Sequence, residues 1–371
     1  MDELVTHAQQ RTTVGLIGIS LGPSSQRDVT APSRSRLCNA RSRLCKTPLA
    51  LLVALAVVMP AGCNESKKSE STNSPAVKQA DTASDGALKK DDGGASKTIG
   101  VSLLTVQHKF YQDMRAGMER EAGKLGYKLH ITSAEFDAAR QSNQIDEFLV
   151  QKVNAIVVCP ADSRSVGAGI VTANQAGIPV FTADIANLSP RGEVVSHIAS
   201  DNVQGGREAA KLMVEAVGAQ GKVAILTHPE VASVQDRVKG FKEELSKHAG
   251  LQVVVELSSD GKRDKAARVM EDLLQAQPEL SGVFCINDDS ALGALATIEA
   301  AGKLGKIKIV GYDATPEARA KIQSGDMYGD VIQNPDRIGE LTIRAIHDHF
   351  SGKAPVKVIP VEVGVFKKGS S

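Results

Sequence analysis

Short apolar runs rich in Val, Ile and Ala alternate, from residue 98 onward, with longer segments whose apolar residues recur every three or four positions. The short runs are typical of buried strands in a parallel sheet, and the longer segments are typical of helices packed on it. The first series of runs predicts strands at 98–104, 128–132, 155–159, 180–183 and 195–198. The second series predicts strands at 222–226, 251–257, 282–286, 307–311 and 328–332.

The segment after the first run shows the helical pattern. Met114, Met118 and Ala122 lie four residues apart, and Gly126 stands where a helix would end. The pattern predicts a helix over 112–125. Strands that alternate with helices are typical of parallel sheets, and two series of about 120 residues each favour two doubly wound α/β domains over one oversized sheet.

The N-terminal part of the chain differs from the rest. Residues 47–62 are apolar, follow the basic residues Arg43 and Lys46, and are followed at once by Cys63. This order is typical of a secretory signal, because the run is shorter than the roughly 20 residues that span a bilayer. A buried core helix is the alternative. Residues 64–97 weaken it, because they contain almost no large apolar residue and therefore predict a disordered tether.

The signal resembles that of bacterial lipoproteins, in which lipid is attached to the cysteine that becomes the mature N-terminus. Ala61, Gly62 and Cys63 match this pattern, and Pro60 replaces the usual Leu. The resemblance implies lipidation of Cys63. Residues 1–36 precede the signal without an apolar run, so we hypothesise that translation starts downstream of Met1.

Charge and motifs exclude several classes of function. The chain has 44 Lys and Arg residues and 43 Asp and Glu residues, so it lacks the basic excess that a nucleic-acid partner requires. Its five cysteines lack the spacing of zinc or dithiol sites, and we expect no metal and no cofactor. No Gly-rich phosphate loop and no Ser/His/Asp ordering is present, so no catalytic residues are predicted.

Polar residues follow many of the predicted strands, at the edge where ligands bind to parallel sheets. Asp, Asn and Gln predominate among them, and their side chains exchange hydrogen bonds with hydroxyl groups. The candidates are Gln107, His108, residues 159–162, Asp184, Asn287, Asp288, Asp289, Asp313, Gln333 and Asn334.

The stretches 192–206, 287–295, 310–317 and 332–340 resemble the ribose-binding protein family of periplasmic sugar receptors, which shares its fold with the effector domains of LacI-type repressors. The resemblance extends from about residue 98 to 368. It implies the type I periplasmic-binding-protein fold, with three hinge crossings near 200–201, 333–334 and 363–364. The expected organisation is a leader and export signal at 1–62, a lipidated cysteine and tether at 63–97, lobe 1 at 98–200 plus 334–362, and lobe 2 at 201–333 plus 363–371.

The resemblance also implies a set of ligand-binding residues. The family's first loop usually reads Asn-Pro-Phe-Phe, where this chain has His108-Lys109-Phe110-Tyr111. The implied ligand-binding residues are His108, Phe110, Tyr111, Asp184, Arg237, Asn287, Asp313 and Gln333. Three positions depart from ribose binders, since Cys159 replaces an Asn, Ile185 replaces an Arg, and Gly261 stands near an aromatic position.

Each of these residues has a simpler alternative role. Asp184 and Asp313 could cap helices, Arg237 could be a solvated helix charge, and His108 could be an ordinary loop residue. Phe110 and Tyr111 could belong to the core.

We expect a monomeric, periplasmic or extracytoplasmic protein that captures a sugar or sugar-like polyol and delivers it to an ABC transporter permease. Its contact with a membrane would be through the lipid anchor alone. A sugar sensor that acts on a membrane receptor is the alternative. A LacI-type repressor is disfavoured, because it needs a helix-turn-helix segment before the first lobe.

Overall fold

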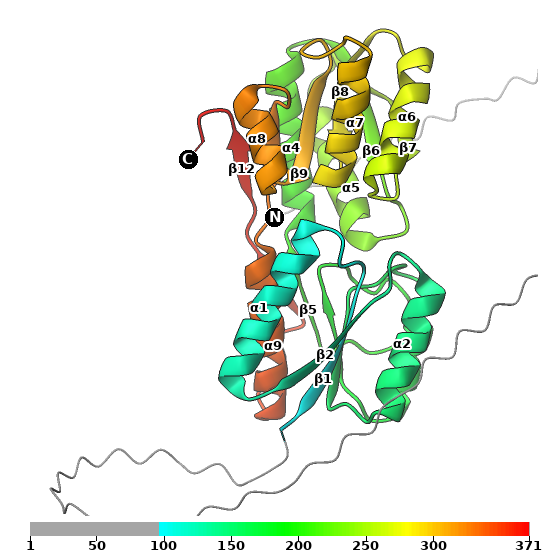
Figure 1. Cartoon of the computed structure of the whole chain (residues 1–371), viewed down its shortest axis with the longest axis vertical. Coiled ribbons are helices and arrows are strands. Elements are labelled where there is room, and N and C mark those ends of the chain that lie inside the picture. Colours follow the sequence, from blue (N-terminus) through cyan, green and yellow to red (C-terminus); the bar gives the residue numbers. More distant parts are fainter. Residues whose placement is uncertain (1–95, 371) are drawn as a thin grey trace, which may run out of the picture. The chain divides into compact units, whose positions relative to one another are not determined.

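The computed structural model describes residues 96–370, which form two mostly parallel sheets flanked by helices (Figure 1). The signal, Cys63 and nearly all of the tether lie outside the described residues. The first sheet has the strand order β11-β5-β4-β3-β1-β2, and all its pairings are parallel. Its strands are β1 (Thr98–Leu103), β2 (Lys128–Ser133), β3 (Ala155–Val158), β4 (Val180–Ala183), β5 (Ser196–Ser200) and β11 (Val358–Val361).

The second sheet has the equivalent order β12-β10-β9-β8-β6-β7. Its pairings are parallel except that of β12, which runs antiparallel to β10. Its strands are β6 (Gly221–Thr227), β7 (Leu251–Ser258), β8 (Leu280–Cys285), β9 (Lys308–Asp313), β10 (Gly329–Ile332) and β12 (Gly364–Lys367).

Helices cover both faces of each sheet, and each sheet with its helices is one lobe. The helices of the first lobe are α1 (Lys109–Leu125), α2 (Ala138–Val150), α3 (Gly167–Gln175) and α9 (Pro335–Phe350). Those of the second lobe are α4 (Asn202–Val217), α5 (Ala232–Leu245), α6 (Arg263–Ala276), α7 (Asp288–Ala300) and α8 (Pro316–Ser324). No helix between residues 96 and 370 is long and apolar enough to cross a bilayer.

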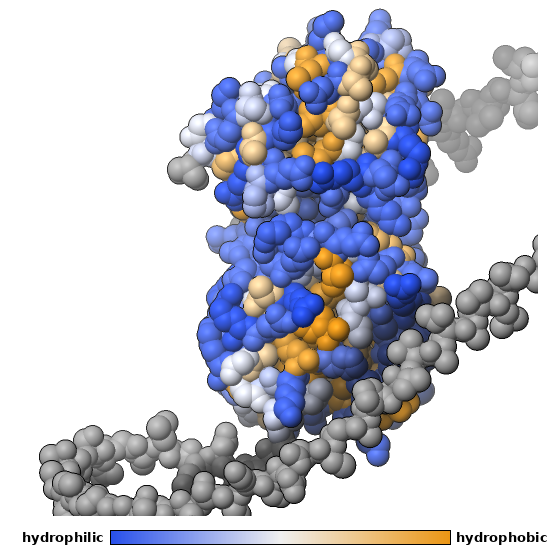
Figure 2. All heavy atoms as spheres, viewed as in Figure 1, coloured by the Kyte–Doolittle hydropathy of each residue, from blue (hydrophilic) through white to orange (hydrophobic). Residues whose placement is uncertain are grey.

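The chain crosses between the lobes three times, as the resemblance implied. It leaves the first sheet between β5 and α4, returns between β10 and α9, and crosses again between β11 and β12 through Glu362 and Val363. Hydrophilic residues cover the visible face of this junction (Figure 2). The fold class predicted from the sequence is therefore confirmed.

All ten predicted strands are present, with ends within two residues of the prediction. The predicted helix runs from Lys109 to Leu125 and is ended by Gly126, which adopts the left-handed conformation with φ 75°. Met114, Met118 and Ala122 are buried, as their spacing predicted. Strands β11 and β12 were not predicted, because they are short edge strands whose residues are largely exposed or half-buried.

Glycines allow close helix crossings in both lobes. A Cβ on Gly339 of α9 would lie 2.1 Å from the carbonyl oxygen of Met114 on α1. In the second lobe, a Cβ on Gly206 of α4 would lie 2.0 Å from the carbonyl oxygen of Arg237 on α5. Any larger residue at these positions would push the helices apart. The α4–α5 crossing therefore fixes the position of Arg237.

Candidate functional site

A small cavity of about 40 Å³ lies between the carboxyl ends of the two sheets. The first lobe contributes the loops after its strands and the start of α1, and the second contributes α5 and the loops after β8 and β9. All eight residues predicted from the sequence line this cavity: His108, Phe110, Tyr111, Asp184, Arg237, Asn287, Asp313 and Gln333.

Asp184 directly follows β4 and lies on the floor of the cavity, with 4% of its surface exposed. Its backbone has a φ of 64°, and its N–H donates to the carbonyl oxygen of Ile198 at 2.8 Å. The hydroxyl of Tyr111 donates to Oδ2 at 2.7 Å, whereas Oδ1 has no hydrogen-bond partner within residues 96–370. Burial raises the pKa of Asp184, and the positive charge of Arg237 opposes this effect. The next element after Asp184 is strand β5, so the capping alternative is wrong.

Arg237 projects from α5 and is buried, so the interpretation as a solvated charge is wrong. Its Nε donates to Oδ1 of Asn202 at 2.9 Å, and its Nη1 donates to the carbonyl oxygen of Ile286 at 2.6 Å. The guanidinium carbon lies 3.9 Å from the centre of the Tyr312 ring. These contacts hold the guanidinium plane firmly, which leaves its outer N–H groups for a ligand.

Asp313 ends β9 and faces Gln333, which follows β10. Nε2 of Gln333 donates to Oδ1 of Asp313 at 2.6 Å, and Oε1 of Gln333 is buried without a partner in the described chain. Burial raises the pKa of Asp313 well above its ordinary value, although Arg237 works against this. Helix α8 is capped by Thr315, so the capping interpretation of Asp313 is also wrong.

Asn287 combines capping with a place in the cavity wall. Its Oδ1 accepts from the N–H of Ser290 at 3.0 Å and caps α7, while its Nδ2 donates to the carbonyl oxygen of Gly261 at 2.9 Å. The next two aspartates have other roles. Asp288 accepts from the N–H of Thr315 at 2.7 Å, and Asp289 pairs with Arg263 at 3.2 Å.

His108, Phe110 and Tyr111 form the wall contributed by the start of α1. His108 Nε2 lies 3.4 Å from Oδ2 of Asp289, so this pair joins the two lobes. Burial lowers the pKa of His108, and Asp289 counteracts the shift. The rings of Phe110 and Tyr111 meet edge to face at 5.1 Å, and both pack into the apolar core of the lobe while they line the cavity.

The three departures from ribose binders differ in position. Ile185 and Gly261 line the cavity, whereas Cys159 is fully buried and is not among the lining residues. Burial raises the pKa of the Cys159 thiol well above its ordinary value, and the neighbouring Asp184 adds to the effect. Cys159 therefore lies behind the cavity wall.

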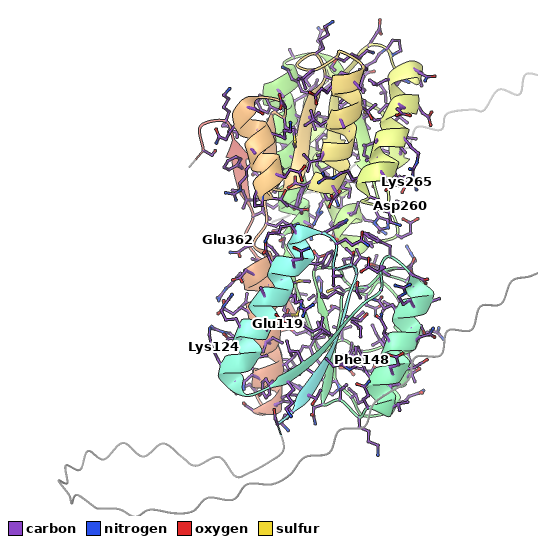
Figure 3. The ribbon with its side chains drawn as sticks, viewed as in Figure 1. Glu119, Lys124, Phe148, Asp260, Lys265 and Glu362 are labelled. Atoms are coloured by element: carbon purple, nitrogen blue, oxygen red, sulfur yellow. The ribbon has the colours of Figure 1, made fainter. Side chains whose placement is uncertain are left out.

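Several lining residues were not predicted from the sequence, among them Phe136 and His228. Phe136 follows the end of β2 closely, at the sheet edge where ligands bind. Its position just after a strand is therefore the signal in the sequence, as it is for the polar candidates. Asp260, in the loop that carries Gly261, forms an ion pair of 2.7 Å with Lys265 of α6, beside the junction of the lobes (Figure 3).

Comparison with known proteins gives consistent matches. Residues 99–354 match the family model described as a periplasmic binding protein domain. The ribose import binding protein of Bacillus subtilis is 36% identical over 274 residues, which are 73% of this chain and 88% of that protein. A solute-binding protein of an ABC transporter from Agrobacterium vitis, bound with α-D-tagatopyranose, has 30% identity and a TM-score of 0.70, covering 74% of this chain and 95% of that one. The Caulobacter myo-inositol binding protein, bound to myo-inositol, gives the same four values.

Proposed function

Because the chain belongs to the periplasmic binding protein domain family, we propose that it captures a sugar or sugar-like polyol between its lobes and delivers it to an ABC transporter. Relatives with this architecture are binding proteins of transporters and not enzymes. Their place of action is extracytoplasmic, and the same location is proposed for this chain.

The observation that carries the proposal is a set of buried acceptors without donors. Oδ1 of Asp184 and Oε1 of Gln333 have no partner in the described part of the chain, although both residues line the cavity. A buried acceptor that stays unpaired costs roughly 1–3 kcal/mol. Hydroxyl groups of a sugar or polyol would donate to these oxygens, and Arg237 would donate to a ligand oxygen.

Capture follows from the two-lobe arrangement. Residues of both lobes line the cavity, so a ligand that contacts both favours the closed form by its differential affinity. Direct contacts add to closure. Ser163 of the first lobe donates its N–H to the carbonyl oxygen of Glu230 at 3.0 Å, and its Oγ accepts from the N–H of Ala232 at 2.9 Å. The transporter would recognise the surface that closure brings together.

The remaining features of the proposal rest on the sequence. Lobe 1 would comprise 98–200 plus 334–362 and lobe 2 would comprise 201–333 plus 363–371, a division supported by the membership of the strands in the two sheets. The lipid on Cys63 would be the only membrane anchor of a monomeric protein, with residues 64–97 as its tether. No nucleic-acid partner and no cofactor are proposed.

A thermal-shift screen of the purified protein against pentoses, hexoses, cyclitols and open-chain polyols tests the function. A ligand at 100 times its dissociation constant stabilises the native state by about 2.7 kcal/mol, which raises the unfolding temperature measurably. Amino acids and nucleotides serve as control ligands. The proposal would be contradicted if amino acids or nucleotides stabilised the protein while no sugar or polyol did.

A further inference from the structure

Phe136 lies in the cavity wall opposite the second lobe. Hydrogen bonds of its two neighbours, Glu135 and Asp137, fix the loop that carries it. Glu135 and Phe136 both have positive φ, at 51° and 63°. The carboxylate of Glu135 accepts from Oγ1 of Thr105 at 2.9 Å and from Nε2 of Gln107 at 2.9 Å, which fastens the loop to the end of β1. Asp137 then caps α2 by accepting from two backbone N–H groups. Phe136 is therefore held between two anchored neighbours.

Aromatic and basic groups surround the Phe136 ring. The ring centres of Phe136 and His108 are 5.3 Å apart in an edge-on arrangement, and the ring of His228, from the second lobe, is 6.2 Å away. Nζ of Lys262 lies 4.6 Å from the centre of the ring. The ring remains partly exposed, and it lines the cavity together with Phe110 and Tyr111.

Apart from the imidazole of His228, the described part of the second lobe presents no aromatic side chain to this cavity. Gly261 has a φ of 66°, and a Cβ there would lie 3.3 Å from Nδ2 of Asn287. The backbone conformation thus disfavours any larger residue at position 261. His228, whose Nδ1 would be 3.9 Å from that Cβ, presents a polar ring instead. The rings of Phe110, Tyr111 and Phe136 lie on the first lobe, whereas the second lobe contributes polar, charged and aliphatic side chains.

We propose that Phe136 is the aromatic wall of the cavity and selects cyclic ligands, such as a pyranose or a cyclitol, over open-chain polyols. This inference rests on the proposed function. The ring of a pyranose or a cyclitol presents a face of axial C–H groups, which packs flat against an aromatic ring. Its hydroxyl groups then point at the polar groups that line the second lobe. An open-chain polyol has no such face and gains less from Phe136.

Titration calorimetry tests the inference with one cyclic ligand from the screen and the open-chain alditol nearest to it. Phe136→Leu keeps an apolar side chain without the aromatic face, and we expect about 2- to 13-fold weaker binding of the cyclic ligand, since aromatic contacts contribute about 0.5–1.5 kcal/mol beyond buried area. Binding of the alditol should change less than twofold. Phe136→Tyr keeps the face and should bind the cyclic ligand like the unaltered protein.

Lys262→Met is the matched control, because Lys262 contacts the Phe136 ring but is not among the residues lining the cavity. If it weakens binding as much as Phe136→Leu does, the ring acts as a latch between lobes and the inference is wrong. Equal losses for the cyclic and open-chain ligands in Phe136→Leu would also overturn it. Phe136→Met replaces Phe136→Leu if the latter fails to fold. Absence of sugar or polyol binding by the unaltered protein would instead overturn the proposed function, and this inference with it.

Discussion

The hydroxyl of Tyr111 donates to Oδ2 of Asp184 at 2.7 Å and leaves Oδ1 of the same carboxylate free to accept from a ligand. Asp184→Ala should therefore weaken binding of the cognate ligand by about ten- to 150-fold, because a hydrogen bond to a charged group contributes about 1.5–3 kcal/mol. Titration calorimetry measures the loss. Tyr111→Phe removes the internal bond and retains Oδ1, so it should weaken binding less than Asp184→Ala does. Unchanged affinity in Asp184→Ala would exclude the carboxylate from the binding site.

The specificity of the cavity should differ from that of ribose binders at Ile185. The family resemblance implies that ribose binders have an arginine at this position. In this chain Ile185 occupies it and is buried in the cavity wall. A ribose hydroxyl against Ile185 would lose water without gaining a partner, at a cost of roughly 1–3 kcal/mol, so ribose should bind weakly. Ile185→Arg should shift preference toward ribose, because the guanidinium can pair with Oδ1 of Asp184. Tight ribose binding by the unaltered protein would refute this prediction.

Gly206→Ala should lower both stability and affinity. The added Cβ would meet the carbonyl oxygen of Arg237 at 2.0 Å, so α5 must shift and carry the guanidinium with it. Overpacking of this kind costs about 1–3 kcal/mol. Gly123→Ala is the control, because Gly123 is exposed on α1 with no atom within 4 Å of the added Cβ, and this change should stabilise slightly. Equal unfolding temperatures for the two variants would argue against the close crossing.

A buried pair of carboxylates should make stability depend on pH. Oδ1 of Asp288 and Oδ2 of Asp330 are each 3.0 Å from the point that a Cβ on Gly311 would occupy, so the two carboxylates lie close together. Both side chains are almost fully buried. Burial, together with the charge of Asp288, raises the pKa of Asp330 well above its ordinary value. The folded state therefore binds more protons than the unfolded state above the ordinary pKa of about 3.9.

The free energy of unfolding should accordingly fall as the pH rises from about 4 toward the raised pKa of the folded protein. Asp330→Asn preserves the shape without a titrating group, so it should flatten this slope and be at least as stable as the unaltered protein at neutral pH. Urea unfolding at a series of pH values compares the two. Identical slopes would show that Asp330 does not hold a proton in the fold.

Cys63→Ser should release the protein from membranes without a change in ligand affinity, because the proposed tether separates the anchor from the lobes. Cell fractionation followed by calorimetry on the released protein measures both effects. If the variant still sediments with membranes, the lipid anchor is not at Cys63.

The sequence predicted the inner strands well, because strands buried on both faces are continuous apolar runs. It did not predict β11, where Pro360 interrupts such a run and Val358 is exposed at the sheet edge. The eight cavity residues were found from their place after strands and from the family resemblance. Contacts between residues far apart in the sequence could not be predicted from it. Examples are the pairing of Asp288 with Asp330 and the position of Cys159 behind the cavity wall. Asn287 illustrates the limit. Its position after a strand predicted a cavity residue, but it did not show that the same side chain also caps a helix.

The shortness of the third crossing limits how the protein can open. Only Glu362 and Val363 separate the end of β11 from the start of β12, and Figure 3 labels Glu362 at this link. Three extended peptide steps reach at most about 11 Å, so the two sheets cannot move apart at this edge. Opening must be a rotation, with the link near its axis and the opposite rim of the cavity moving farthest. The distance between two spectroscopic labels placed on either side of the link beside Glu362 should therefore hardly change when ligand binds. The distance between two labels placed across the far rim should change measurably.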